Sequence, residues 1–156
     1  MNKNYPKKYK ITSGYGKGAY ELVAFDRTLI DAGISNYNLL RVSSILPIKC
    51  NYSEIIDLEE GSPLLTAYGT ISSNMKGEII ASAVGIGIPK DKEKVGVIME
   101  YSGRCTAKIA EDTVREMTKM AMNNHHIEIE KIISSSIEKE VTDTDYVSVI
   151  SAVAMW

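Results

Sequence analysis

Apolar residues recur along this chain with two different periods, and these periods predict two helices and a set of strands. In residues 20–32 they recur every three or four positions, as on one face of a helix, and Gly33 is well placed to end that helix. A second seam at helical spacing follows Thr106, the expected N-cap, and reaches about Asn123. The seam residues are Leu22, Phe25, Leu29 and Ala32 in the first helix, and Ala110, Val114, Met117 and Ala121 in the second.

The remaining apolar segments are predicted to be strands. Residues 78–88 alternate between small and larger apolar side chains, so both faces look covered, as in a central strand. The small side chains on one face leave room for a closely packed neighbour. The other predicted strands are residues 9–12, 36–47, 63–72, 95–101, 127–140 and 146–155. Helices and strands in this order indicate an α+β fold.

Three segments are predicted to lack regular structure. Residues 1–8 form an expected loose tail, and residues 51–61 a polar, acidic loop with a helical turn. The glycine-rich run at 13–18 lacks the Gly-Lys-Ser/Thr ending of a phosphate-binding loop, because Gly18 follows Lys17, so we expect a turn-rich loop there. The one basic cluster, expected to be solvated, consists of Lys3, Lys7, Lys8 and Lys10. No linker or repeat divides the 156 residues, which suffice for a single domain with its own core.

Composition and charge exclude several classes of protein but do not indicate a particular function. A hydrophobic content of 44% and a charged content of 24% are typical of a soluble globular protein, and a net charge of −2 argues against a general nucleic-acid binder. Cys50 and Cys105 have no CxxC neighbour, and His125 and His126 are adjacent, so we expect no metal site. No apolar run reaches membrane-spanning length and no secretory signal opens the chain, so we expect a cytoplasmic protein without membrane contact.

The segment 36–47 is an apolar strand that carries two adjacent hydroxyls, Ser43 and Ser44. Its apolar residues, all expected to be buried, are Leu39, Leu40, Val42, Ile45 and Leu46. Buried hydroxyls cost free energy unless they are hydrogen-bonded. The structural interpretation is that both serines bond to nearby backbone, and the dipeptide alone favours it, since serine pairs also occur at 72–73 and 134–136. The functional interpretation is that this serine pair reacts.

Three separate stretches of the sequence bear on that choice. They are DRTLIDAGISNYNLLRVSSILP at 26–47, PKDK at 89–92 with GVIMEYSGRC at 96–105, and TVREM at 113–117. Together, in this order and over most of the chain from about Phe25, they resemble the pyruvoyl-dependent arginine decarboxylases. The resemblance implies a layered αββα sandwich that assembles as a homo-oligomer, a trimer or a hexamer. Two departures are mild, because Leu46 stands where methionine is often found and Ser102 replaces an acid.

Decarboxylation of an amino acid leaves a carbanion at Cα, for which no ordinary side chain is a good electron sink. Pyridoxal phosphate would need a phosphate cradle that the sequence does not show, so we expect no pyridoxal phosphate. The resemblance implies instead that the Ser44 hydroxyl attacks the Ser43 carbonyl and that elimination then cuts the chain. The products would be a β chain of residues 1–43 and an α chain of residues 44–156, with a covalent pyruvoyl group made from Ser44. A tightly held strand suits this reaction, because the nucleophile must stay over its own carbonyl.

The resemblance also assigns roles to four other residues. Glu100 would deliver a proton to the product carbon, and Asp26 would bind the guanidinium of the substrate by charge-assisted hydrogen bonds. Asn38 and Ser43 match positions that contact the substrate or hold the cofactor. Glu100 ends an apolar strand, where burial would raise the pKa of its carboxyl, although a strand-end acid facing water is the alternative. For Asp26, beside the apolar stripe of its helix, the alternative is a solvated helix acid.

The expected function is therefore that of a self-processing enzyme that converts L-arginine to agmatine and CO₂. Agmatine would feed polyamine synthesis, or the proton consumed would support acid resistance. Two alternatives stay open at this point. The same machinery could act on another amino acid, or the chain could be a non-cleaving structural or regulatory homologue, although the presence of Ser43, Ser44 and Glu100 counts against the latter.

Overall fold

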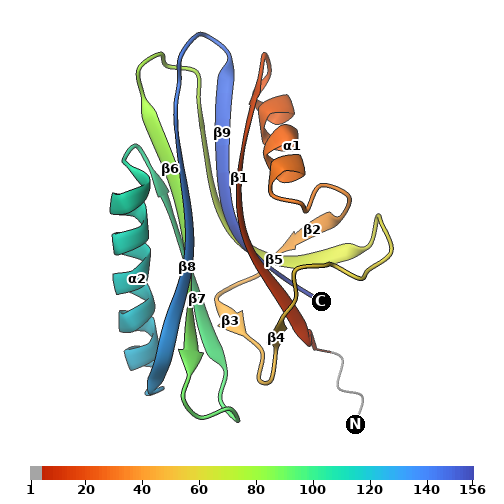
Figure 1. The fold of residues 1–156 in the computed structure, drawn as a ribbon, viewed down its shortest axis with the longest axis vertical. Coiled ribbons are helices and arrows are strands. Elements are labelled where there is room, and N and C mark those ends of the chain that lie inside the picture. Colours follow the sequence, from red (N-terminus) through yellow and green to blue (C-terminus); the bar gives the residue numbers. More distant parts are fainter. Residues whose placement is uncertain (1–4) are drawn as a thin grey trace.

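Two β-sheets packed face to face form the centre of the structure, and one helix covers the outer face of each (Figure 1). The structure is a computed structural model that describes residues 5–156. The elements in chain order are β1 (Lys8–Gly18), α1 (Glu21–Asp31), β2 (Asn38–Arg41), β3 (Ile45–Leu46), β4 (Asn51–Tyr52), β5 (Pro63–Ser73), β6 (Ile79–Pro89), β7 (Gly96–Gly103), α2 (Ala107–Asn124), β8 (Ile129–Glu140) and β9 (Tyr146–Met155). One sheet has the strand order β2-β5-β9-β1-β4 and the other β3-β7-β6-β8. This confirms the predicted single-domain αββα sandwich.

The main core lies between the two sheets. Val153 of β9 and Ala67 of β5 project into it from one sheet, and Val84, Ile86 and Ile98 from the other. All five side chains are buried. Burying such side chains contributes about 1.5–3 kcal/mol for each of the larger ones, which makes this layer the principal source of stability.

Helix α1 lies unusually close to β1, because β1 presents glycines to it at alternate positions. A Cβ atom built on Gly14 would lie 2.6 Å from the backbone N of Ala32, and one on Gly16 would lie 2.3 Å from the carbonyl O of Ala24. The expected turn-rich loop at 13–18 is therefore wrong, since these residues continue β1. Glycine at every second position was the signal of a strand face against which a helix packs.

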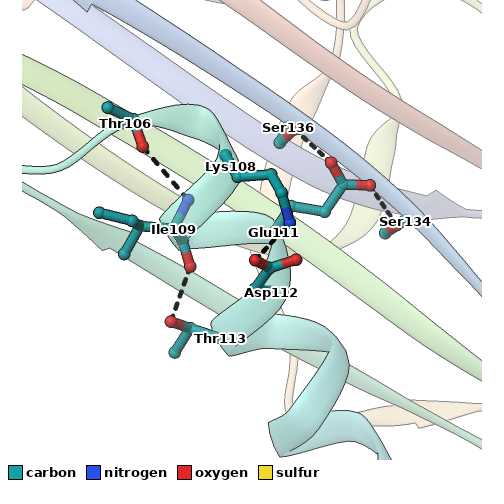
Figure 2. A network of polar contacts seen from close by, with 8 residues as sticks. All are labelled: Thr106, Lys108, Ile109, Glu111, Asp112, Thr113, Ser134 and Ser136. Carbon is teal, nitrogen blue, oxygen red and sulfur yellow. Dashed lines mark hydrogen bonds and ion pairs between the residues drawn. The ribbon is translucent and has the colours of Figure 1, made fainter.

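Helix α2 packs on β6 in the same manner. A Cβ on Gly85 would lie 2.7 Å from Thr118 Oγ1, and one on Gly87 would lie 2.6 Å from Met122 Cγ. This confirms that the small side chains of the central strand make room for a neighbour. Thr106 is the N-cap, as expected, and its hydroxyl accepts a 3.3 Å hydrogen bond from the N–H of Ile109 (Figure 2). In the expected seam of α2, Met117 is only half-buried.

A carboxylate also ties α2 to the edge strand β8. Glu111 accepts hydrogen bonds from Ser134, at 2.7 Å, and from Ser136, at 3.2 Å (Figure 2). Arg115 adds a 2.9 Å hydrogen bond to the Ser134 hydroxyl. The serine run at 134–136 thus has a structural role on its helix-facing side, through side chains of α2 and not through nearby backbone.

The predicted strand 36–47 is divided between the two sheets. Asn38–Arg41 (β2) pairs in parallel with β5, whereas Ile45–Leu46 (β3) pairs antiparallel with β7. The expected burial of its apolar residues is largely wrong, because Leu40 is 49% exposed and Ile45 is 38% exposed. Only Leu46 is buried, and Leu39 and Val42 are half-buried. A strand that changes sheets cannot keep one continuous buried face.

The segments expected to be irregular differ in outcome. The N–H groups of Lys7 and Lys8 both donate to the carbonyl of Trp156, so the tail is tied down from Lys7 onward, and the loose-tail prediction is wrong there. Lys3 lies outside the described residues. Residues 51–61 contain β4 and turns instead of a helical turn. None of the helices within residues 5–156 has the length and apolar character needed to cross a membrane.

Candidate active site

The serine pair lies where the chain crosses from one sheet to the other. On one side of the crossing, the N–H of Val42 donates to the carbonyl of Thr66 on β5, at 3.2 Å. On the other side, the carbonyl of Ser44 accepts a 2.7 Å hydrogen bond from the N–H of Ile98 on β7. The Ser43–Ser44 peptide is therefore held between two anchors that belong to different sheets.

The two serines of this crossing are accessible. Ser43 is exposed and Ser44 is half-buried. Among residues 5–156, neither hydroxyl makes a hydrogen bond, so the structural interpretation, in which both bond to nearby backbone, does not describe them. The sequence argument assumed burial for both, and that assumption fails because the strand is interrupted here.

Glu100 extends from β7 into the space between the sheets. Within its own sheet, Glu100 lies opposite Val84 of β6. From the other sheet, Gly69 of β5 faces Glu100, and a Cβ atom built on Gly69 would lie only 3.3 Å from Glu100 Cβ. The carboxyl is half-buried. Burial raises its pKa, and the positive charge of Arg41 opposes that rise without cancelling it. The expected direction of the pKa of Glu100 is confirmed, and at a given pH a larger share of this carboxyl holds its proton.

The register of the strands brings Glu100 close to the serine pair. The N–H of Ile98 donates to the carbonyl of Ser44, so Ile98 is the residue of β7 opposite Ser44. Glu100 follows two residues later on the same strand. Such diagonal neighbours in an antiparallel pair are separated by about 7–8 Å. The structure thus brings Ser44 and Glu100 together within one chain.

Hydroxyl groups continue the polar region beyond Glu100. Ser102 donates to the Ser82 hydroxyl at 2.9 Å, and Ser82 donates to the carbonyl of Gly69 at 2.8 Å. A Cβ on Gly69 would lie 2.7 Å from Ser102 Oγ, so this glycine makes room for both Ser102 and Glu100. Sequence reasoning missed Gly69, since a single glycine in a strand does not say which residue of another strand faces it.

Arg41 is the second residue that sequence reasoning missed. It ends β2, and its guanidinium donates a 2.7 Å hydrogen bond to the carbonyl of Tyr68. Its Cζ also lies 4.5 Å from the centroid of the Tyr68 ring. The signal in the sequence was a single cation within an otherwise apolar segment, two residues before the serine pair.

Asn38 and Asp26 lie apart from this group. Asn38 is exposed at the start of β2, where its side-chain amide donates to the carbonyl of Gly61 at 2.8 Å. At about 3.3 Å per residue, the strand separates Asn38 from Arg41 by roughly 10 Å. Asp26 is exposed on α1, which packs against the outer face of β1 and β9. None of the hydrogen bonds or ion pairs among the described residues links Asp26 with Ser44 or Glu100, so one chain does not assemble all five predicted site residues.

The residues that could hold an organic cofactor are those at the crossing. A cofactor carbonyl formed from the main chain at position 44 would fit this site, because the backbone carbonyl of Ser44 is anchored and the half-buried acid Glu100 is near. Such a cofactor needs no phosphate cradle and no metal ligands. Within residues 5–156, no group of three or more His, Cys, Asp or Glu side chains could hold a metal ion. Cys50 and Cys105 are both free thiols.

Comparison with known proteins gives one consistent result. The family model for pyruvoyl-dependent arginine decarboxylase matches residues 8–156. A pyruvoyl-dependent arginine decarboxylase of Methanococcus aeolicus is 44% identical over 97% of this chain and 90% of its own length, and one of Methanocaldococcus jannaschii is 40% identical over the same shares. Another, of Thermococcus kodakarensis, is 37% identical over 88% of each chain. The chain therefore belongs to the pyruvoyl-dependent arginine decarboxylase family.

Proposed function

We propose that this chain is a self-processing arginine decarboxylase, which converts L-arginine to agmatine and CO₂ with a pyruvoyl group made from Ser44. The observation that carries the proposal is the Ser43–Ser44 peptide, accessible and anchored at both ends, with the half-buried acid Glu100, whose pKa is raised by burial, close by. The family to which the chain belongs supports both the substrate and the cofactor.

Self-processing needs only groups that the crossing supplies, together with water. Ser44 Oγ attacks the carbonyl carbon of Ser43, the peptide C–N bond breaks, and an ester joins the two residues. Loss of the Ser44 Cα proton and cleavage of its Cβ–O bond leave a carboxylate on Ser43 and dehydroalanine at position 44. Water then hydrolyses dehydroalanine to a pyruvoyl group and ammonia. Anchoring residue 44 to Ile98 restricts the chain to conformations in which the attack is short, and this lowers its entropic cost.

In the processed enzyme, the pyruvoyl group supplies the electron sink for the loss of CO₂. The hydrogen bond from the N–H of Ile98 to the carbonyl of residue 44 can persist after the chain is cut. Both residues belong to the α chain, so the cut does not separate them. Glu100 holds a proton in a half-buried site and gives it to the product carbon. Ser43 becomes the carboxy-terminal residue of the β chain and lies beside the substrate.

Recognition of the arginine side chain requires a second copy of the chain. Asp26 is exposed on the outer side of the sandwich, so it meets a substrate bound at Ser44 of another copy. Its carboxylate pairs with the guanidinium through charge-assisted hydrogen bonds, and Asn38 contributes an amide. The assembly is then a homo-oligomer, a trimer or a hexamer, with sites between neighbouring copies.

Intact mass spectrometry under denaturing conditions tests the proposal. The wild-type chain should give two species that correspond to residues 1–43 and to residues 44–156 with a pyruvoyl amino terminus. Ser44→Ala should give a single full-length species and form no agmatine. The matched control is Ser72→Ala, in a serine pair remote from the crossing, which should be cut like the wild type. A wild-type chain that stays intact after prolonged incubation would overturn the proposal.

A further inference from the structure

A cavity of about 520 Å³ lies between the two sheets at one end of the sandwich, the lower end in Figure 1. Its walls are formed by the beginning of β1, by β3 and β4, and by the ends of β6, β7 and β8 that lie near the loop 90–94. A volume of about 300–1,000 Å³ is typical of small-molecule sites. None of the five proposed active-site residues lines this cavity, and Gly96, which does, precedes Glu100 by four residues, roughly 13 Å along β7. The cavity is therefore a second candidate site, separate from the space around Glu100.

Positive side chains dominate the rim of this cavity. Four lysines and a single acid, Glu130, line it, although the whole chain has a net charge of −2. Lys49 and Lys92 each form an ion pair with a nearby glutamate. Lys94 and Lys131 have no ion-pair partner within residues 5–156. Two ammonium groups, each with three hydrogen-bond donors, are thus left to bind an anion.

The floor of the cavity is apolar and aromatic. Tyr9 and Leu46, which contribute to it, are buried in the core between the sheets. Tyr52 packs edge-to-face on Tyr9, with ring centroids 5.8 Å apart, and is itself 53% exposed, so much of its ring stays accessible. Burial raises the pKa of the Cys50 thiol, which also lines the cavity, to about 11, as expected of a poorly hydrated floor. Such a floor suits a planar organic body, whereas the rim suits a negative charge.

Lys49 has a backbone conformation that lysine rarely adopts. Its φ is 56°, and it is the third residue of the turn that is closed by a 3.3 Å hydrogen bond from the N–H of Cys50 to the carbonyl of Pro47. A positive φ at this position of a turn favours glycine or asparagine. Lysine here costs conformational free energy, and it adds a positive side chain to the wall of the cavity.

We propose that this cavity binds a phosphate monoester with a planar organic body, such as a nucleoside monophosphate. The phosphate dianion accepts charge-assisted hydrogen bonds from Lys94 and Lys131, and the planar body lies against the exposed ring of Tyr52. Lysine suits this task because its ammonium is a compact point charge. The site is additional to the proposed decarboxylation and does not depend on it. The alternative is a solvated lysine surface that attracts every anion weakly and without regard to its organic body.

Isothermal titration calorimetry of the assembled protein separates these interpretations. The probes are AMP, adenosine and inorganic phosphate. AMP should bind with a dissociation constant roughly tenfold or more below that of either fragment, because only AMP offers both the charge and the planar body. Ser44→Ala, which leaves the chain uncut, should bind AMP like the wild type. That result keeps the test independent of the decarboxylase function.

Substitutions at the rim locate the binding. Lys94→Gln and Lys131→Gln should each weaken AMP binding by about tenfold, as expected for the loss of a charge-assisted hydrogen bond. The matched control is Lys119→Gln, which removes an exposed lysine of α2, 3.8 Å from Glu116, and should leave AMP binding unchanged. Lys49→Gly should also weaken AMP binding, yet it should not lower the thermal unfolding midpoint of the free protein, because glycine accepts the positive φ.

Three results would overturn the inference. AMP could fail to bind, or it could bind equally well to the wild type and to the Lys94→Gln and Lys131→Gln variants. Equal affinities for AMP and inorganic phosphate, both abolished by high salt, would identify the rim as a solvated lysine surface.

Discussion

The carbonyl of Ser44 accepts a 2.7 Å hydrogen bond from the backbone N–H of Ile98, on a strand more than fifty positions later in the chain. This bond sets the register of β3 against β7 and so decides which residue of β7 lies near the serine pair. Ile98 lies opposite Ser44, and Glu100 is the acid two positions beyond it on the same strand. The pairing of two backbones therefore determines the distance between a proposed nucleophile and a proposed proton donor.

Gly69→Ala should impair both folding and turnover. The added Cβ would lie 2.7 Å from Ser102 Oγ and 3.3 Å from Glu100 Cβ, so the sheets would have to separate or Glu100 would have to move. We expect a loss of about 1–3 kcal/mol in the free energy of unfolding, typical of an overpacked core, together with a lower kcat. Urea unfolding and an agmatine assay measure the two effects.

Removing the obstructing hydroxyl provides the control for Gly69→Ala. The double variant Gly69→Ala/Ser102→Ala has no Oγ at the closest contact, so it should recover most of the lost stability. If the single variant were as stable as the wild type, Gly69 would not be required for the close approach of the sheets.

The raised pKa of Glu100 predicts how stability depends on pH. The folded state binds the Glu100 proton more tightly than the unfolded state, in which the pKa is about 4.3. The stabilising contribution of this proton is fully present below that value and is lost as pH rises through the folded-state pKa. The free energy of unfolding of Glu100→Gln, relative to the wild type, should therefore increase as pH rises from about 4 through the folded-state pKa.

Chemical denaturation of both proteins at several pH values checks this sign, with Glu116→Gln as an exposed control on α2. A difference between Glu100→Gln and the wild type that stays constant over the range, or decreases toward high pH, would contradict the prediction. In the processed enzyme, the same titration predicts that kcat falls as pH rises and Glu100 loses its proton.

Gly16→Ala should weaken the attachment of α1. Its Cβ would lie 2.3 Å from the carbonyl O of Ala24 and 2.5 Å from the backbone N of Thr28, neither of which can turn aside as a side chain could. The helix would have to shift as a unit, and we expect a loss of at least about 1–3 kcal/mol. Thermal unfolding measures it. Lys17→Ala, at the next position, removes only an exposed ion pair with Asp143 and should change stability by less than about 1 kcal/mol.

Asp26→Ala should reduce kcat/KM for arginine by roughly tenfold to a hundredfold, the amount expected for the loss of charge-assisted hydrogen bonds. Asp112→Ala, an exposed acid on α2, serves as the control. If Asp26 acts on a substrate at another copy, mixing Asp26→Ala with Ser44→Ala chains before assembly should restore activity, because some interfaces then combine intact Asp26 with intact Ser44. Mixtures as inactive as their components would exclude a site shared between copies.

Local patterns in the sequence predicted several elements correctly. The extents of the two helices, the cap at Thr106 and the central strand around Val84 all depend on residues close together in the chain, for which spacing alone carries the information. The predicted seam of α1 was wrong in part, because Leu22 is 77% exposed and the buried residues of this helix are Ala24 and Thr28. Resemblance over three stretches indicated the family and the layered architecture. The glycines at 14 and 16 were misread as a loop, because their reason lies in a helix that packs on them rather than in their own neighbours.

The sequence by itself determined the periodicity of the helices and strands, the family, and which residue types were available for chemistry. Only the tertiary structure decided that the predicted serine strand is two short strands in different sheets, with an accessible peptide between them. It also decided that Gly69 faces Glu100 while Asp26 lies on helix α1, on the outer side of the sandwich. The physical reason is that these relationships depend on sheet order and register, which arise from backbone pairing between segments far apart in the chain and leave no local pattern.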